Sequence, residues 1–351
     1  MSRPSRSVGL WLLSSSILVL GMILLGGLTR LTRSGLSITT WDPILGTIPP
    51  LGDTAWREAF DRYLASPEGH LRADDMDLDA FRHIYRIEWA HRLLGRIIAL
   101  WLLVPMAFFA FRRQLARTTL VRVLGVIVLG GAQGVLGWYM VKSGLVDVPH
   151  VSPYRLMAHF LVGVLLFAVL LSSALDALAP VTTMAAAPLA ATHAKRVFVV
   201  VLTLTLAWGA LMAGHHAGVV FPDFPTMGGD LVPVQLRTRP FLLRDLVADA
   251  VGVHFMHRAL ALLLLFCAVA LLVTVGRSDS SRRARAFAAL LVFAVLLQGT
   301  LGALTVMNHV PLSLASLHQG AAMFVVLAFV LLLRELRGAR NMVQGTISPR
   351  E

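Results

Sequence analysis

Four histidines occupy matching places in the two halves of this 351-residue chain, each near the start of a long apolar segment. They are His91, His159, His257 and His318. Imidazole is a common metal ligand, and a haem iron takes one axial ligand on each face of the macrocycle. A structural zinc ion prefers four ligands, and each half offers two well-placed ones. We therefore interpret each pair as the axial ligands of a haem iron, with hydrogen bonding between helices as the alternative for any single histidine.

Other residues repeat around these histidines. The distance from His91 to Gln133 is 42 residues and that from His257 to Gln298 is 41. Three matches in one order predict a duplicated unit of four spans, with both copies facing the same way. The matched features are His91-Arg92 with His257-Arg258, Gln133–Gly137 with Gln298–Gly302, and His159 with His318.

The halves differ at one informative position. Glu88 lies three residues before His91, about one helical turn, and His254 has the same place before His257. An ionisable side chain at membrane depth is costly and usually functional. We predict a reactive first half, with Glu88, His91 and His159 as catalytic residues, and a fixed cofactor site in the second half. The alternative is that Glu88 only pairs with a nearby arginine.

Further polar residues are secondary candidates. Arg92 and Arg258 are predicted to pair with the carboxylates of a haem, although arginines at these depths also extend to the membrane surface. Gln133 and Gln298 are predicted to contact the cofactor. Three more histidines are minor candidates without partners in the repeat, namely His215, His216 and His254.

Composition indicates the elements that must position these residues. The chain is 57% hydrophobic and 14% charged, with a mean hydropathy of +0.74, which excludes a disordered chain and an ordinary soluble enzyme. A single cysteine excludes a disulfide framework, a thiolate zinc site and an iron–sulfur cluster built on this chain alone. Eight apolar segments of spanning length are expected. They lie near Leu10–Leu28, Ile84–Phe111, Val123–Met140, Tyr154–Ala179, Val197–Ala213, Val251–Val275, Ala286–Met307 and Val310–Leu333.

The distribution of basic residues predicts the orientation of these spans. Arginines and lysines in the connections after spans two, four and six, and at both termini, favour a cytoplasmic location for those segments. The net charge of +12 is then a feature of topology and not of nucleic-acid binding. The first segment resembles a signal peptide in its basic start, but we interpret it as an uncleaved span because no clear cleavage site follows. The first outer loop, Leu31–His83, is expected to be partly helical.

The predicted fold is an all-α integral membrane protein. Its eight transmembrane helices are expected to form two tandem-repeated four-helix bundles, one over residues 1–183 and one over residues 184–351. All four histidines would then lie toward the outer face.

Several stretches resemble the haem A synthase family, in the form found in alphaproteobacteria and mitochondria. They cover nearly the whole chain and include Gly26–Ser37, Trp41–Pro43, Glu88–Gly95, Gln133–Leu145, Ser152–Arg155 and Leu317–Gln319. The resemblance implies an oxidoreductase of the bacterial inner membrane. It would convert the C8 methyl group of haem O to a formyl group, giving haem A for cytochrome oxidase.

The resemblance also implies residue roles and partners. His91 and His159 would hold haem O as substrate, His257 and His318 a resident haem b, and Glu88 matches a glutamate on which activity depends. Expected partners are the lipid bilayer, haem O synthase as supplier of substrate and an unidentified electron donor, with no nucleic acid; a homo-oligomer is compatible with the sequence. The first outer loop lacks the cysteine pair of the Gram-positive branch, so a thiol step there does not apply.

Two other classes remain open at this stage. A diheme electron carrier resembling cytochrome b would use both pairs without altering either macrocycle, but it would not need an acid in one half alone. A transporter with parallel repeats would normally show broken helices or ionisable groups near mid-membrane. Here the histidines lie toward one face.

Reporter fusions test the orientation. Fusions after Arg117 and after Asp230 should report a cytoplasmic and an outer location respectively, because basic connections are retained on the cytoplasmic side. The reverse pair of locations would refute the predicted orientation.

Overall fold

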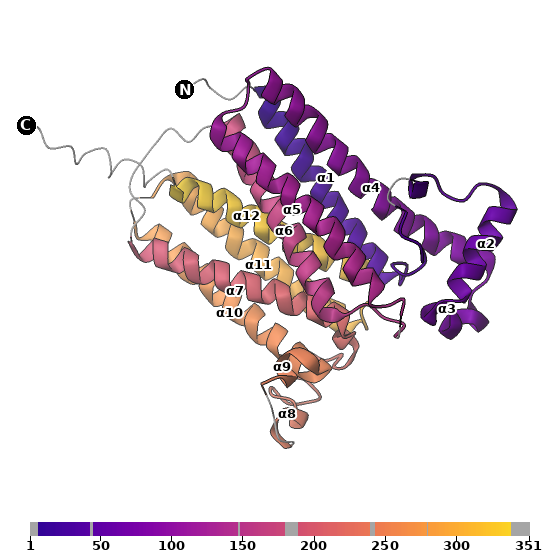
Figure 1. Ribbon diagram of the computed structural model, residues 1–351. Helices are drawn as coiled ribbons and strands as arrows, with labels where there is room; N and C mark the ends of the chain where they lie inside the picture. Colours follow the sequence, from indigo (N-terminus) through magenta and orange to yellow (C-terminus); the bar gives the residue numbers. More distant parts are fainter. Residues whose placement is uncertain are drawn as a thin grey trace, which may run out of the picture. The chain divides into compact units, whose positions relative to one another are not determined.

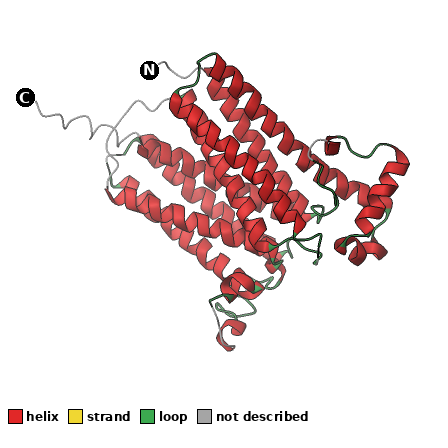
Figure 2. Cartoon of the chain, in the orientation of Figure 1, coloured by secondary structure: helices red, strands yellow, loops and turns green. Residues whose placement is uncertain are grey.

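The computed structural model describes residues 6–42, 45–146, 148–179, 189–238, 243–278 and 280–337. These residues are helical or irregular, apart from one isolated bridge between Met227 and Asp230 (Figures 1 and 2). Eight of the described helices are long and apolar enough to cross a membrane. The predicted all-α fold with eight spans is therefore confirmed, and the chain is a multi-pass membrane protein.

The helices match the predicted segments, with ends shifted by a few residues. The long helices are α1 (Arg6–Leu31), α4 (Leu78–Phe111), α5 (Arg117–Lys142), α6 (Pro153–Leu178), α7 (Leu189–Gly214), α10 (Ala250–Gly276), α11 (Arg282–Met307) and α12 (Leu312–Arg337). The short elements are η1 (Leu45–Thr47), α2 (Gly52–Leu64), α3 (Pro67–Arg72), η2 (Ala73–Asp75), η3 (Ala217–Val219), α8 (Val234–Thr238) and α9 (Asp245–Ala248).

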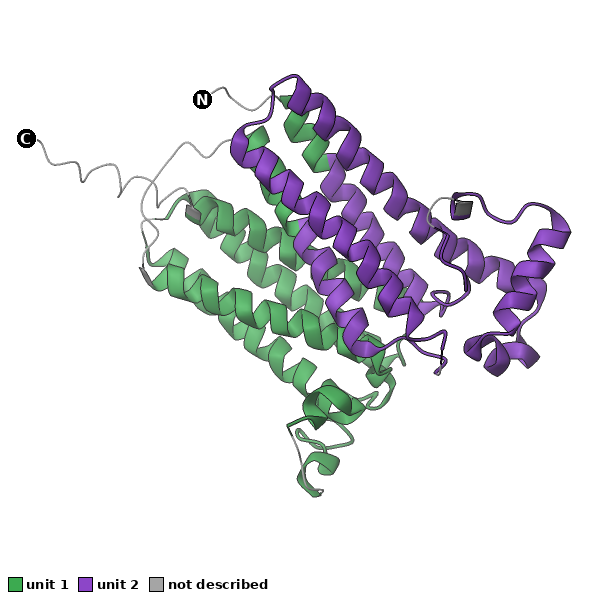
Figure 3. Cartoon of the chain, viewed as in Figure 1, with its two compact units in different colours: residues 1–13, 168–351 green, residues 14–167 purple. Residues whose placement is uncertain are grey.

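The chain divides into two compact units (Figure 3). Unit 2 comprises residues 14–167 and contains α4, α5 and most of α1 and α6. Unit 1 comprises residues 1–13 and 168–351 and contains α7, α10, α11 and α12. The predicted boundary between residues 183 and 184 lies outside the described residues.

The first outer loop folds onto the start of α4. Tyr63 of α2 and Phe81 of α4 are fully buried, and the Trp56 ring meets the Phe81 ring edge-on at a centroid distance of 6.3 Å. Asp77 caps α4 by accepting a hydrogen bond of 2.7 Å from the Ala80 backbone N–H. This cap and the aromatic cluster explain why α4 begins at Leu78 instead of Ile84, and the predicted helical character of the loop is confirmed.

Replacement of Phe81 should loosen this outer segment. Phe81→Ala deletes a fully buried ring and is expected to destabilise the local fold by about 3–5 kcal/mol. Limited trypsin digestion should then cleave residues 52–75 several times faster. Leu71→Ala is the control, since Leu71 is 72% exposed; equal cleavage of both variants would show that the cluster does not hold the segment.

Candidate functional site

Unit 1 brings two of the predicted histidines together. His257 of α10 and His318 of α12 have ring centroids 6.5 Å apart, with their planes at 84°. An imidazole nitrogen binds a transition metal at about 2 Å, so rings on opposite sides of one iron have centroids about 6 Å apart. The spacing of this pair fits bis-histidine ligation of a haem iron.

The His318 ring is oriented by its neighbour on α11. Its Nδ1 lies 3.1 Å from the Gln298 carbonyl oxygen, and its Nε2 lies 3.3 Å from the Gln298 side-chain nitrogen. When Nδ1–H donates to the carbonyl group, Nε2 carries the lone pair and accepts from the Gln298 amide. A histidine that binds iron through Nε2 requires this tautomer, and its other nitrogen usually donates to a backbone carbonyl or carboxylate group.

Each of the four histidine rings lies against a glycine of the preceding long helix. A Cβ atom built on Gly302 would lie 2.8 Å from His318 Cε1, and one on Gly209 would lie 3.2 Å from His257 Cε1. Such distances are shorter than ordinary carbon contacts of about 3.5–4.0 Å. Any side chain larger than the hydrogen of glycine at these positions would therefore displace the rings.

Unit 2 repeats these contacts. A Cβ atom on Gly137 of α5 would lie 3.0 Å from His159 Cε1, and one on Gly26 of α1 would lie 3.2 Å from His91 Nε2. The Gln133 amide donates a hydrogen bond of 2.7 Å to the His159 carbonyl oxygen. The shared contacts support the predicted duplication. Gln133 and Gln298 bind the neighbouring histidine or its backbone, and their predicted contact with a cofactor stays a prediction.

Glu88 is buried in a network of hydrogen bonds. The side chain is 3% exposed, and its Oε1 accepts from Arg92 Nε at 3.0 Å and Nη2 at 2.7 Å. Its Oε2 accepts from the Ser37 hydroxyl at 2.7 Å and from the Ile38 backbone N–H at 2.9 Å. The carboxylate therefore links α4 to the loop that follows α1. Sequence reasoning anticipated the Arg92 contact as an alternative but missed Ser37 and Ile38.

Arg92 also donates directly to that loop. Its Nη1 lies 2.9 Å from the Thr40 carbonyl oxygen and its Nη2 lies 2.8 Å from the Ile38 carbonyl oxygen. The guanidinium group therefore fixes the loop next to His91. The pairing of Arg92 with haem carboxylates stays a prediction.

Arg258 binds the corresponding loop of unit 1 in the same way; we call this set of arginine-to-loop hydrogen bonds the clamp. Its Nη2 donates to the carbonyl oxygens of Phe221 and Asp223 at 3.2 and 2.9 Å, and its Nη1 donates to that of Thr226 at 2.8 Å. Its Nε donates to His254 Nε2 at 3.0 Å. His254 is fully buried and replaces Glu88 as the acceptor for the clamping arginine. The two units thus share the clamp but differ in the charge of its acceptor.

The other minor candidates belong to the helix end and loop of unit 1. His216 has φ 52°, and Arg33 has φ 53° at the corresponding place, seven residues after the glycine that contacts a histidine ring. His215 Nε2 lies 3.1 Å from the Val247 carbonyl oxygen. His216 therefore has a positional partner in the repeat, contrary to the sequence-based interpretation.

The clamped loop of unit 1 is also held by Asp223. The Asp223 carboxylate accepts from the Gly228 and Gly229 backbone N–H groups at 3.0 and 3.2 Å and from the Thr226 hydroxyl at 2.7 Å. These bonds, the Gly228 N–H foremost, lower the Asp223 pKa to about 2. Because the pKa is lower in the folded loop, this stabilisation is present above about pH 4 and is lost as the pH falls toward 2.

The fold and the site define a class of protein, a polytopic α-helical membrane protein in which one pair of histidines, His257 and His318, has a spacing that fits a haem iron. A family model described as cytochrome oxidase assembly protein matches residues 9–330. A haem A synthase from Azorhizobium caulinodans is 40% identical over 93% of this chain and 93% of its own length. Similar proteins of that name from Rhodospirillum centenum and Caulobacter sp. are 37% and 40% identical, over 97% and 93% of this chain and 91% and 95% of their own lengths. The chain therefore belongs to the cytochrome oxidase assembly protein family.

Glycine substitutions test the close contacts. Gly302→Ala should push the His318 ring out of line and lower the amount of low-spin haem b retained on purification, measured by absorption spectroscopy. Gly299→Ala, three residues earlier on α11, is the matched control, because its Cβ would meet nothing within 4 Å. Both changes raise helix propensity equally. Equal haem retention by the two variants would refute the contact argument.

Proposed function

We propose that this chain is a haem A synthase, an oxidoreductase that converts the C8 methyl group of haem O to a formyl group. The product, haem A, is destined for cytochrome oxidase. One observation supports this assignment most strongly. The two units share histidines, glycines and clamping arginines, but Glu88 in unit 2 is replaced by His254 in unit 1. A pure electron carrier has no need for this difference in charge.

On the basis of this difference we assign the two histidine pairs to different haems. His91 and His159 hold haem O as substrate, beside the carboxylate of Glu88. His257 and His318 hold a resident haem b, which when bound supplies one-electron transfer. The two sites lie in an N-terminal bundle over residues 1–183 and a C-terminal bundle over residues 184–351.

Glu88 acts as the catalytic carboxylate in this proposal. It lies one helical turn from His91, where its charge favours positive charge that develops on the substrate, or where it accepts a proton. The Ser37 hydroxyl and the Ile38 N–H fix its position before the reaction begins.

The proposal extends to cellular context. The protein lies in the bacterial inner membrane with cytoplasmic termini, and the histidines lie toward the outer face. Haem O synthase is the partner that supplies the substrate, and a separate redox protein exchanges electrons with the resident haem.

Replacement of Glu88 tests the catalytic role. Glu88→Gln keeps the size of the side chain but removes its charge, so the variant should retain haem b yet stop at haem O or a partly oxidised product. Chromatography of extracted haems beside an absorption spectrum of the purified variant measures both results. Near-normal haem A from a well-expressed variant would contradict the role.

Ser37→Ala tests whether Glu88 acts through its charge or by holding the loop after α1. It removes one hydrogen bond to the same carboxylate, worth about 1.5–3 kcal/mol, but keeps the charge. If Glu88 acts through its charge, Ser37→Ala should retain part of the haem A synthesis, because the carboxylate keeps its charge and its bonds to Arg92 and the Ile38 N–H, whereas Glu88→Gln should stop it. Equal loss of haem A in both variants would show that Glu88 acts by holding the loop.

A further inference from the structure

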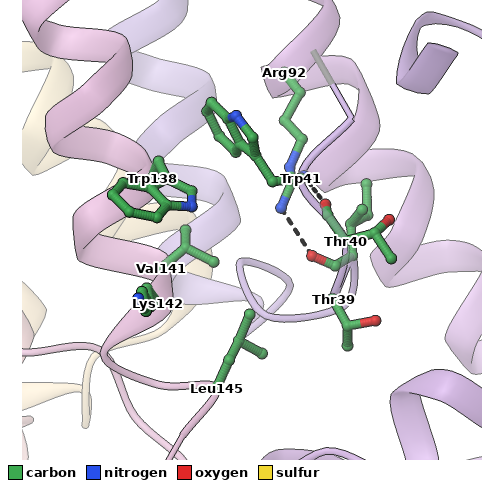
Figure 4. Close-up of a pocket in the computed structure, with 9 residues that line it drawn as sticks. Thr39, Thr40, Trp41, Arg92, Trp138, Val141, Lys142 and Leu145 are labelled. Carbon is green, nitrogen blue, oxygen red and sulfur yellow. Dashed lines mark hydrogen bonds between the residues drawn. The ribbon is translucent and has the colours of Figure 1, made fainter. Parts of the chain in front are cut away.

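A pocket of about 250 Å³ opens in unit 2 between the loop after α1 and the last turns of α5 (Figure 4). Thr40 and Trp41 line it from the loop, Trp138 and Lys142 from α5, and Arg92 from α4. The Trp41 and Trp138 rings have centroids 6.4 Å apart and are tilted by 60°. The pocket therefore has aromatic sides and two cationic residues.

Residues that line the pocket lie within about one helical turn of the predicted substrate site along α4 and α5. Arg92 directly follows His91 on α4. Val141, which also lines the pocket, lies one turn beyond Gly137 on α5, and Gly137 contacts the His159 ring. A macrocycle held between His91 and His159 would thus have one edge toward the pocket.

The charges of the two cations are balanced differently. The Arg92 guanidinium is paired with the Glu88 carboxylate at 2.7 Å and with loop carbonyl groups. The Lys142 ammonium lies 5.2 Å from the centroid of the Trp138 ring, and among the residues that the structure describes, those that line the pocket include no Asp or Glu. Lys142 is therefore the residue whose charge is available for an anion.

Unit 1 differs at the same places. Counted from the glycines that contact His159 and His318, the counterparts of Trp138 and Lys142 are Ala303 and Met307. The unit assigned to the resident haem therefore has no cation at this place. Lys142 and Met307 thus differ between the same two units as Glu88 and His254 do.

We propose that this pocket binds a propionate carboxylate of haem O, with Lys142 as its ionic partner and Trp41 and Trp138 as its apolar sides. The inference rests on the proposed assignment of haem O to His91 and His159. The volume suits one edge of the substrate and not a whole cofactor, since pockets for complete small molecules are about 300–1,000 Å³. A single exposed ion pair contributes modestly, as is appropriate for a substrate that must leave after oxidation.

Amine labelling of the intact protein tests the proposal directly. The chain has two lysines, Lys142 and Lys195, and Lys195 serves as an internal control. Purified protein is treated with acetic anhydride without haem, with haem O, and with haem O dimethyl ester, whose propionates are esterified. Peptide mass spectrometry then measures acetylation at both sites. Haem O should lower the acetylation of Lys142 several-fold, the ester should protect it much less, and Lys195 should be unchanged.

Other outcomes would overturn the proposal. Equal protection by haem O and its ester would show that the macrocycle merely covers Lys142. No protection, although haem O binds and is converted to haem A, would refute the pocket assignment and leave the proposed function intact. Protection of haem-free protein in nanodiscs of phosphatidylglycerol, but not of phosphatidylcholine, would identify the pocket as a lipid headgroup site. Absence of both haem O binding and conversion would overturn the proposed function as well.

Two variants supply an independent measurement. Lys142→Met installs the residue found at the corresponding place in unit 1 and should weaken haem O binding roughly two- to fivefold in a spectroscopic titration. Lys142→Arg keeps the charge and should bind within about a factor of two of the parent. Haem b content should be equal in both variants. Equal haem O affinity of the methionine variant and the parent would contradict the ion pair.

Discussion

The close approach of a histidine ring to a glycine backbone is the constraint on which the two sites depend. The contact occurs four times, at Gly26, Gly137, Gly209 and Gly302, each on the long helix that precedes the one bearing the histidine. At each of these positions the neighbouring helix presents a glycine, and a Cβ atom there would lie 2.8–3.2 Å from an atom of the histidine ring. Replacing any of these glycines with a larger residue would displace the histidine ring, since densely packed interiors do not absorb an added methyl group without displacement.

A second constraint acts on the loops beside these rings. In each unit one arginine follows a histidine directly and binds the backbone carbonyl groups of the loop after the first long helix, so loop and ligand are positioned by the same turn of helix. The acceptor at the base of the clamp differs, an anionic carboxylate in unit 2 and a fully buried imidazole in unit 1. One architecture can thus provide a site with a negative charge next to the ligand and a site without one, which is the physical basis for assigning substrate and resident cofactor to different units.

Much of this arrangement was predictable from the sequence, because its signals are local. Runs of apolar residues locate the eight spans, and the His-Arg and Gln-Gly repeats locate the histidines that we propose as ligands. The partners of Glu88 were not predictable in the same way: Ser37 lies 51 residues from Glu88, and nothing in its surroundings indicates the contact. The targets of Arg92 and Arg258 are backbone carbonyl groups, which carry no side-chain signature. The early start of α4 depends on Asp77 as a cap and on aromatic packing with α2, which the apolar pattern of the span does not reveal.

Haem identity in single-histidine variants tests the central claim most directly, namely that each histidine pair holds a different haem. The protein would be produced together with a source of haem O, purified, and its haems extracted and separated by chromatography. His91→Ala and His159→Ala should keep haem b and lose haem O and haem A, whereas His257→Ala and His318→Ala should lose haem b first. Loss of the same haem from all four variants would contradict the division of roles between the two units.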